Sequence, residues 1–166
     1  MIGGVRADAR TLRGYALTYG VEARIGGNVE TIARGAVAGS LGPGSDILAL
    51  VDHDPAKVLG RTRSGSLRLS DDERGLAFEV ELPDTSAARD VLALVERGDA
   101  GGMSFGFTVK PGGDEWRGNR RTLRSIALHE ISVITSHPAY GGTTVEARAR
   151  AALDVDAMRR RLRLYA

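Results

Sequence analysis

The chain has 166 residues, 42% of them hydrophobic and 27% charged, which predicts a single globular domain with a sizeable hydrophobic core. It contains no cysteine, so disulfides, thiolate metal sites and a cysteine nucleophile are excluded. The net charge of +2 is close to balanced and argues against a nucleic-acid partner, while the absence of an apolar run of about 20 residues argues against a membrane-spanning helix.

The N-terminal part of the chain predicts short strands and little helix. Alternating apolar residues predict a strand over 12–20. Residues 28–42 predict a short extended piece and then one or two helical turns, which end at Gly42 and Pro43. An apolar run over 46–54 predicts the next strand, which ends in charged residues.

The middle of the chain combines three short strands with the clearest helix. Residues 58–84 predict three strands, with turns at Ser64–Gly65 and Asp71–Gly75. A helix is predicted over 84–98, capped at its start by Asp84 or Thr85 and ended by Gly98. Its apolar positions recur at helical spacing: Ala88, Val91, Leu92 and Val95.

The C-terminal part predicts further strands and a last helix. Residues 102–109 alternate as a strand, and 119–140 predict one or two more strands that end at Pro138. A final helix is predicted over 145–164. This mostly β pattern with short turns predicts an antiparallel or mixed barrel rather than a wound α/β sheet.

Ser104 stands between glycines inside the strand predicted over 102–109. Residues 102–106 match the G-x-S-x-G pattern of a nucleophile elbow, but that motif needs a strand-to-helix turn and Ser104 is followed by strand-like alternation. The elbow is therefore rejected. A glycine in a strand interior costs conformational entropy and has no side chain to pack, so it needs another explanation. We expect Gly101 and Gly102 to let another group approach Ser104. Phe105 and Phe107 would anchor the opposite face of the strand.

A nucleophilic serine needs a base and a group that orients the base. The chain has three histidines, His53, His129 and His137, and His53 ends an apolar strand where a side chain can meet substrate. His129 and Glu130 are neighbours on a predicted strand, so we expect them to point to opposite faces, and only one of them can join Ser104.

Each of these residues also has an explanation without catalysis. Ser104 can be a small residue that permits close packing, and His53 can be a loop histidine beside Asp52 and Asp54. Glu130 can pair with Arg121 or Arg124. A metal site built from His53, His129 and His137 is a further alternative, although no H-E-x-x-H or comparable spacing supports it.

Three segments together resemble the tailed-phage prohead serine protease family, which is related in fold to herpesvirus assemblin. They are ALVDHDPAKVLGRT (49–62), ERGLAFEVELPDTSAARDVLALVERGDAGGMSFGF (73–107) and LHEISVITSHPAY (128–140). The resemblance extends from about Tyr15 to Thr144. It implies an assemblin-like α+β fold, in which a mostly antiparallel β-barrel of about six to eight strands is flanked by two or three helices. The protease domain would cover 1–144, with an arginine-rich helix or tail over 145–166.

The resemblance also implies roles for the candidate residues. Ser104 corresponds to the nucleophile and His53 to its base. The third member corresponds to Glu130, because the phage pattern has an acid there. Assemblin relatives use a second histidine instead, which makes His129 the alternative third member and His137 a more distant one.

The implied function is that of a serine endopeptidase. It would process phage capsid and scaffold proteins, and itself in the tail after Thr144, during prohead maturation. We expect it to act in the interior of the prohead, in the bacterial host cytoplasm, without a cofactor or metal and without a membrane or nucleic-acid partner. A homodimer is compatible with the resemblance, since assemblin relatives dimerise. The alternative is a non-catalytic capsid-assembly or scaffold-binding module of the same fold, in which Ser104 is structural.

Overall fold

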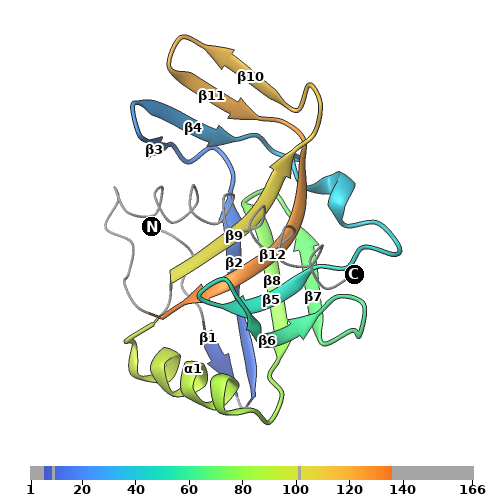
Figure 1. The fold of residues 1–166 in the computed structure, drawn as a ribbon, viewed down its shortest axis with the longest axis vertical. Coiled ribbons are helices and arrows are strands. Elements are labelled where there is room, and N and C mark those ends of the chain that lie inside the picture. The colour runs from blue at the N-terminus through green and yellow to red at the C-terminus, as the bar shows by residue number, and fades with distance from the viewer. Residues whose placement is uncertain (1–5, 9, 101, 136–166) are drawn as a thin grey trace, which may run out of the picture.

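The computed structural model describes residues 6–8, 10–100 and 102–135. These residues form three four-stranded sheets, one α-helix and one short 3-10 turn (Figure 1). The strands are β1 (Arg6–Asp8), β2 (Thr11–Thr18), β3 (Ala23–Ile25), β4 (Asn28–Ile32), β5 (Leu48–Val51), β6 (Asp54–Arg61), β7 (Leu67–Asp71), β8 (Gly75–Glu81), β9 (Gly102–Val109), β10 (Asp114–Arg117), β11 (Arg120–Leu123) and β12 (Ile126–Ile134). The helices are η1 (Ala38–Ser40) and α1 (Ser86–Arg97).

The first sheet has the antiparallel order β1-β2-β8-β7 and shows the alternation of a sheet with one buried face. Leu12, Leu76 and Val80 are at most 1% exposed and face the core. The opposite face carries charged side chains, among which Arg13 and Arg68 both pair with Glu79. This sheet therefore covers one side of the core and leaves its other side to solvent.

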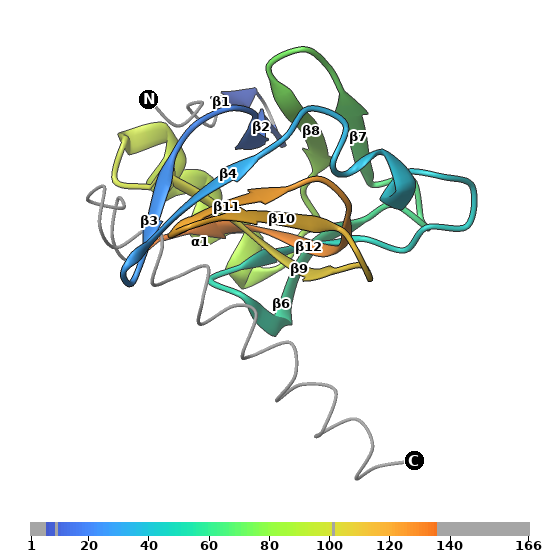
Figure 2. The ribbon, with the colours of Figure 1, turned by 90° about the horizontal axis from the view of Figure 1, so that it is seen from above.

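The second sheet has the order β10-β11-β4-β3 and lies at the upper end of the molecule in Figure 1, nearest the viewer in Figure 2. Two antiparallel hairpins meet in it through the parallel pair β4 and β11. The backbone N–H of Ala33 donates to Leu123 O at 2.8 Å, and that of Ile126 donates to Ala36 O at 2.9 Å. These bonds fix the second sheet to the start of β12.

The third sheet has the order β6-β5-β12-β9, and it is the one in which both faces of the central strands are buried. β12 runs parallel to β5 and antiparallel to β9. Strands buried on both faces are normally near-continuous apolar runs. β9 and β12 depart from this rule at Ser104, Glu130 and Ser132, which are at most 3% exposed. The buried polar residues of the third sheet therefore require an explanation beyond packing.

Helix α1 connects β8 to β9 and lies at the lower end of the molecule in Figure 1. Thr85 Oγ1 accepts a hydrogen bond from Ala88 N at 3.3 Å and caps its start. Gly98 ends it in the left-handed region at φ 79°, where glycine is favoured. Both ends match the helix predicted from sequence, and its apolar face, with Ala88, Val91 and Val95, is buried.

The α+β class and most predicted elements are confirmed, and the barrel is not. The pairing among the described residues leaves each sheet open at both edges. Only one α-helix lies in the described part of the chain, instead of two or three, and the segment predicted around 28–42 forms β4 and a single 3-10 turn. The helix predicted over 145–164 lies outside the described residues. Within them, no helix is long and apolar enough to cross a membrane.

Candidate active site

The register between β9 and β12 brings the buried polar residues together. Ser104 lies opposite Ser132, and Gly106 lies opposite Glu130. Residues opposite each other in a sheet share a face, so all four belong to one face of the third sheet. Ser104 lies within β9 and not at a strand-to-helix turn, which confirms the rejection of the elbow.

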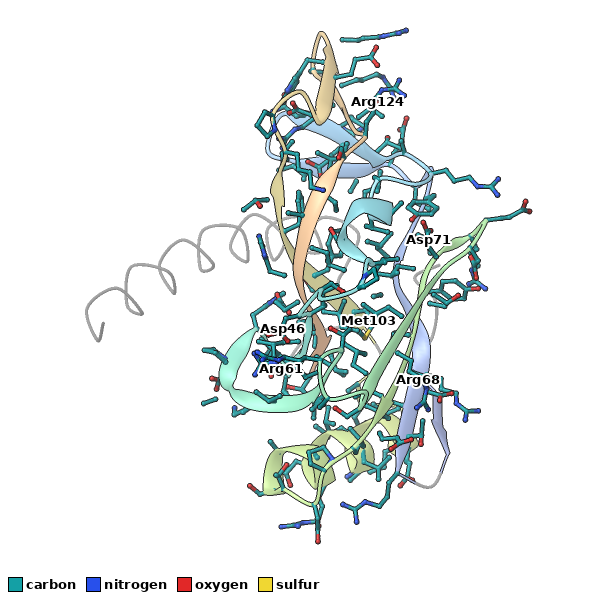
Figure 3. The ribbon with its side chains drawn as sticks, turned by 90° about the vertical axis from the view of Figure 1, so that its right-hand side faces the viewer. Asp46, Arg61, Arg68, Asp71, Met103 and Arg124 are labelled. Atoms are coloured by element: carbon teal, nitrogen blue, oxygen red, sulfur yellow. The ribbon has the colours of Figure 1, made fainter. Side chains whose placement is uncertain are left out.

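The opposite face of β9 belongs to the hydrophobic core. Phe105 and Phe107 are 1% and 8% exposed, and their rings stack at a centroid distance of 5.3 Å. Met103 also lies in the interior of the molecule (Figure 3). These side chains anchor the strand, as predicted, and so fix the position of Ser104 on the polar face.

Gly106 provides the space that the Glu130 carboxylate occupies. A Cβ atom at position 106 would lie 2.6 Å from Glu130 Oε1 and 3.1 Å from its Cγ, which is too close for any side chain. At Gly102, where we expected the close approach, a Cβ would meet nothing within 4 Å, and Gly101 lies outside the described residues. The glycine that the site requires is therefore Gly106.

His53 lies in a two-residue turn between β5 and β6. Val51 pairs with Asp54, and the two residues between them have positive φ, 49° for Asp52 and 58° for His53. These are the φ signs of a type I′ hairpin turn, which normally takes Asn-Gly or Asp-Gly. Asp and His are among the non-glycine residues that tolerate this region best, but each costs about 1–3 kcal/mol that the surroundings must offset.

Bonds from β12 hold this turn in place. Asp52 N donates to Val133 O at 3.0 Å, and His53 N donates to Ser132 Oγ at 3.2 Å. The Asp52 carboxylate accepts a bond from Thr135 N at 2.7 Å and another from the Thr135 hydroxyl. The strained turn is therefore tied to the strand that carries Glu130.

The imidazole of His53 is paired with Glu130. His53 Nδ1 lies 2.6 Å from Glu130 Oε1, and the two side chains are 14% and 4% exposed. The other carboxylate oxygen, Oε2, accepts a hydrogen bond from Ser132 Oγ at 2.6 Å. A close carboxylate fixes both the orientation and the tautomer of an imidazole.

The alternative in which Glu130 pairs with an arginine is wrong, whereas His53 does lie in a turn, as the alternative of a loop histidine expected. Arg121 pairs with Asp114 and Glu30, and the Arg124 guanidinium pairs with Glu115, so neither arginine neutralises Glu130. The carboxylate beside the imidazole comes from β12 and not from Asp52 or Asp54, the sequence neighbours of His53.

The tautomer of His53 follows from this pairing. In a neutral imidazole beside an ionised carboxylate, which only accepts hydrogen bonds, Nδ1 carries the proton and Nε2 carries the lone pair. His53 Nε2 and Ser104 Oγ are both buried, and neither has a hydrogen-bond partner in the part of the chain that the structure describes. Such buried atoms are rare in folded proteins and call for an explanation, of which a catalytic role is one. The site thus holds a hydroxyl oxygen and an imidazole nitrogen that no hydrogen bond among the described residues uses.

His129 departs from the expected alternation. The pairing of Leu128 with Phe107 and of Glu130 with Gly106 leaves His129 as the extra residue of a β-bulge. Its Nε2 lies 3.0 Å from Thr108 Oγ1, a side chain on the same face of β9 as Ser104 and Gly106. The prediction that His129 and Glu130 point to opposite faces is therefore wrong. The Glu130 carboxylate lies beside the His53 imidazole.

The proposed metal site gains no support from the described residues. Among them, no group of three or more His, Cys, Asp or Glu residues could hold a metal ion. His137, the third residue of that alternative, lies outside them.

Sequence reasoning missed Ser132 and the role of Asp52. One signal for Ser132 was available, because a residue two positions from Glu130 on a strand shares its face. The strained turn had no comparable signal, since Asp-His is not the residue pair that a type I′ turn normally takes.

Comparison with known protein families gives a match over most of the chain. The model of the family described as Caudovirus prohead serine protease matches residues 4–158 of the chain. Neither curated proteins nor solved structures give a significant match.

Proposed function

The chain belongs to the caudovirus prohead serine protease family, and on that premise we propose that Ser104, His53 and Glu130 form its catalytic triad. A protease of this family acts in capsid maturation. The three residues have the chemical types that acyl transfer through a serine needs: a nucleophile, a base and an acid that orients the base.

One observation carries the assignment of the triad. The part-buried pair of His53 Nδ1 and Glu130 Oε1, at 2.6 Å, supports Nε2 as the basic nitrogen of a neutral imidazole. Ser104 lies on the same sheet face as Glu130, and its Oγ has no competing hydrogen bond among the described residues. A satisfied structural serine would instead be expected to bond a neighbour.

Acylation begins when Ser104 Oγ attacks the carbonyl carbon of the scissile peptide bond. His53 Nε2 takes the hydroxyl proton, so the imidazole becomes a cation with protons on both nitrogens. Glu130 stabilises this cation through Oε1 without taking its proton. The proton on Nε2 then passes to the leaving amine nitrogen, the C–N bond breaks, and the acyl group stays on Ser104.

Deacylation repeats these steps with water. His53 Nε2 takes a proton from a water molecule as the water oxygen attacks the acyl carbon. The bond from that carbon to Ser104 Oγ breaks, and Nε2 returns the proton to Oγ. The products are a new carboxyl terminus and the free enzyme.

We propose capsid and scaffold proteins as the substrates, together with the protease itself. This rests on the family, whose description names a prohead protease. Self-cleavage is proposed in the segment after Thr144. The proposed place of action is the interior of the prohead.

Co-expression with the major capsid protein of the same phage tests the function. The wild-type chain, Ser104→Ala and His53→Ala are each co-expressed with it, and all products are weighed by intact-mass spectrometry. We expect trimmed capsid protein with the wild type and full-length protein with both variants, because losing the nucleophile or the base costs on the order of 10⁶ in turnover.

Trimming that survives both substitutions would overturn the triad. Normal particle assembly with untrimmed capsid protein, in the wild type and in both variants alike, would instead favour a scaffold-binding role in which Ser104 is structural.

A further inference from the structure

We propose that Ser132 is a positioning residue whose hydroxyl links the Glu130 carboxylate to the backbone of His53. The proposal rests on the triad proposed above and adds a fourth residue to it. Ser132 is fully buried in β12, directly opposite Ser104 in β9. It touches the proposed acid through its side chain and the proposed base through that residue's main chain.

The direction of both hydrogen bonds is fixed by the chemistry of the groups. A hydroxyl has one proton to donate and lone pairs with which to accept. The backbone N–H of His53 can only donate, so Ser132 Oγ accepts it, at 3.2 Å. The single hydroxyl proton is then free to point at Glu130 Oε2, 2.6 Å away. Ser132 therefore satisfies both neighbours at once.

The hydrogen bond from Ser132 Oγ to Glu130 Oε2 fixes the rotation of the carboxylate. The terminal torsion of a glutamate is soft, so one hydrogen bond leaves the carboxylate plane poorly defined. Glu130 has both oxygens engaged, Oε1 by His53 Nδ1 and Oε2 by Ser132 Oγ. With both bonds made, Oε1 stays directed at the imidazole.

The hydrogen bond from the His53 N–H to Ser132 Oγ stabilises the strained turn between β5 and β6. His53 has a left-handed backbone at φ 58°, which a residue with a side chain holds only when the surroundings favour it. Its N–H is held by Ser132, and the preceding N–H, of Asp52, is held by Val133 O. One serine thus helps to fix both members of the His53–Glu130 pair, by two separate contacts.

Reaction with a fluorophosphonate tests this without a known peptide substrate. Ser104 Oγ forms a bond to phosphorus, the P–F bond breaks, fluoride leaves, and His53 takes the hydroxyl proton. The rate is followed by intact-mass spectrometry. We expect Ser132→Ala to react about 10–100-fold more slowly, the loss typical of a hydrogen bond to a charged group. Ser70→Ala, at an exposed serine of the edge strand β7, is the control and should react at the wild-type rate.

Two further comparisons separate positioning from packing. Ser132→Thr and Ser132→Val have the same shape and differ in the hydroxyl, so we expect the threonine variant to react at least about tenfold faster than the valine variant. In a Glu130→Ala background, Ser132→Ala still loses its contact with the His53 N–H but no longer acts on the carboxylate, so we expect it to slow the reaction clearly less than it does in the wild type. If the threonine and valine variants do not fold, the comparison in the Glu130→Ala background still distinguishes a positioning role of Ser132 from a packing role.

Two outcomes would overturn the inference. A Ser132→Ala variant that reacts at the wild-type rate would show that the hydroxyl has no part in positioning. An equal slowing in the Glu130→Ala background would show that none of the effect passes through the carboxylate, which contradicts the proposed link between Glu130 and His53. Either result leaves the triad intact if Ser104→Ala and His53→Ala remain unreactive, whereas labelling of Ser104→Ala would remove the triad itself.

Discussion

At the scale of single residues, the site depends on a glycine at position 106. Gly106 has no Cβ, and the Glu130 carboxylate occupies that space. We expect Gly106→Ala to displace Glu130 from His53 and to slow fluorophosphonate labelling about 100-fold, since a shift of about 1 Å in a catalytic group has an effect of this size. Gly102→Ala is the control on the same strand, because its Cβ meets nothing within 4 Å. Equal rates in the two variants would show that Glu130 does not need its present position.

The charge of Glu130 gives a second prediction at this scale. Glu130→Gln keeps the shape of the side chain but removes the charge and allows an N–H to face the imidazole, which favours the wrong tautomer. We expect labelling to slow by about 10³–10⁴-fold. Glu30→Gln is a matched control, since Glu30 is equally buried, at 3% exposed, but lies in the second sheet and pairs with Arg121. A Glu130→Gln variant as reactive as Glu30→Gln would rule out an acid role.

At the scale of elements, the turn between β5 and β6 combines strain with compensation. Asp52 adopts a φ of 49° and accepts two hydrogen bonds from Thr135. Asp52→Ala and Asp52→Gly both lose these bonds, but only alanine resists the left-handed region. We expect alanine to lower the free energy of unfolding by about 2–4 kcal/mol and glycine to lower it by about 1 kcal/mol less, measured by urea unfolding. Equal losses would mean that the backbone conformation contributes nothing to the difference.

The sequence predicted elements best where local chemistry decides them. Helix α1 was predicted together with its capping Thr85 and its terminal Gly98, because caps and helical spacing are local signals. The bulge at His129 was not predicted, since it depends on how β12 pairs with β9. The alternation rule therefore failed at His129 while holding for Ser104 and the phenylalanines of β9.

At the scale of the whole molecule, sheet order could not be derived from the sequence. β12 pairs in parallel with β5, about 80 residues earlier, and this pairing brings His53 to Glu130. The family resemblance predicted that His53 and Glu130 belong to one site, whereas the spacing of apolar residues along the chain did not. The short strands β3 and β10 were missed, because three or four residues carry too little pattern.

Hydrogen-bonded carboxyls on the surface predict how the stability of the whole molecule depends on pH. Hydrogen bonds from neighbouring side chains hold the pKa of five carboxyls below the usual range. The donor and acceptor pairs are Arg61 and Asp46 (Figure 3), Tyr15 and Asp72, Arg68 and Glu79, Arg121 and Asp114, and Arg124 and Glu115. The unfolded chain takes up protons on these groups at a higher pH than the folded chain does. Their contribution is therefore complete above about pH 5 and is lost as the pH falls through the lowered folded values.

We accordingly expect the urea midpoint to fall steadily between about pH 5 and pH 3 and to change less in 1 M NaCl, which screens exposed pairs. A midpoint that stays constant over this range would contradict the assigned pKa directions.

The most direct test of the triad is to locate the residue that a fluorophosphonate modifies. The labelled protein is digested, and the adduct is assigned by tandem mass spectrometry in the wild type, His53→Ala and Glu130→Gln. We predict a single adduct on Ser104 in the wild type, none in His53→Ala, and a strongly slowed adduct on Ser104 in Glu130→Gln. An adduct on a different serine, or undiminished labelling of Ser104 without His53, would contradict the assignment of Ser104, His53 and Glu130 as nucleophile, base and orienting acid.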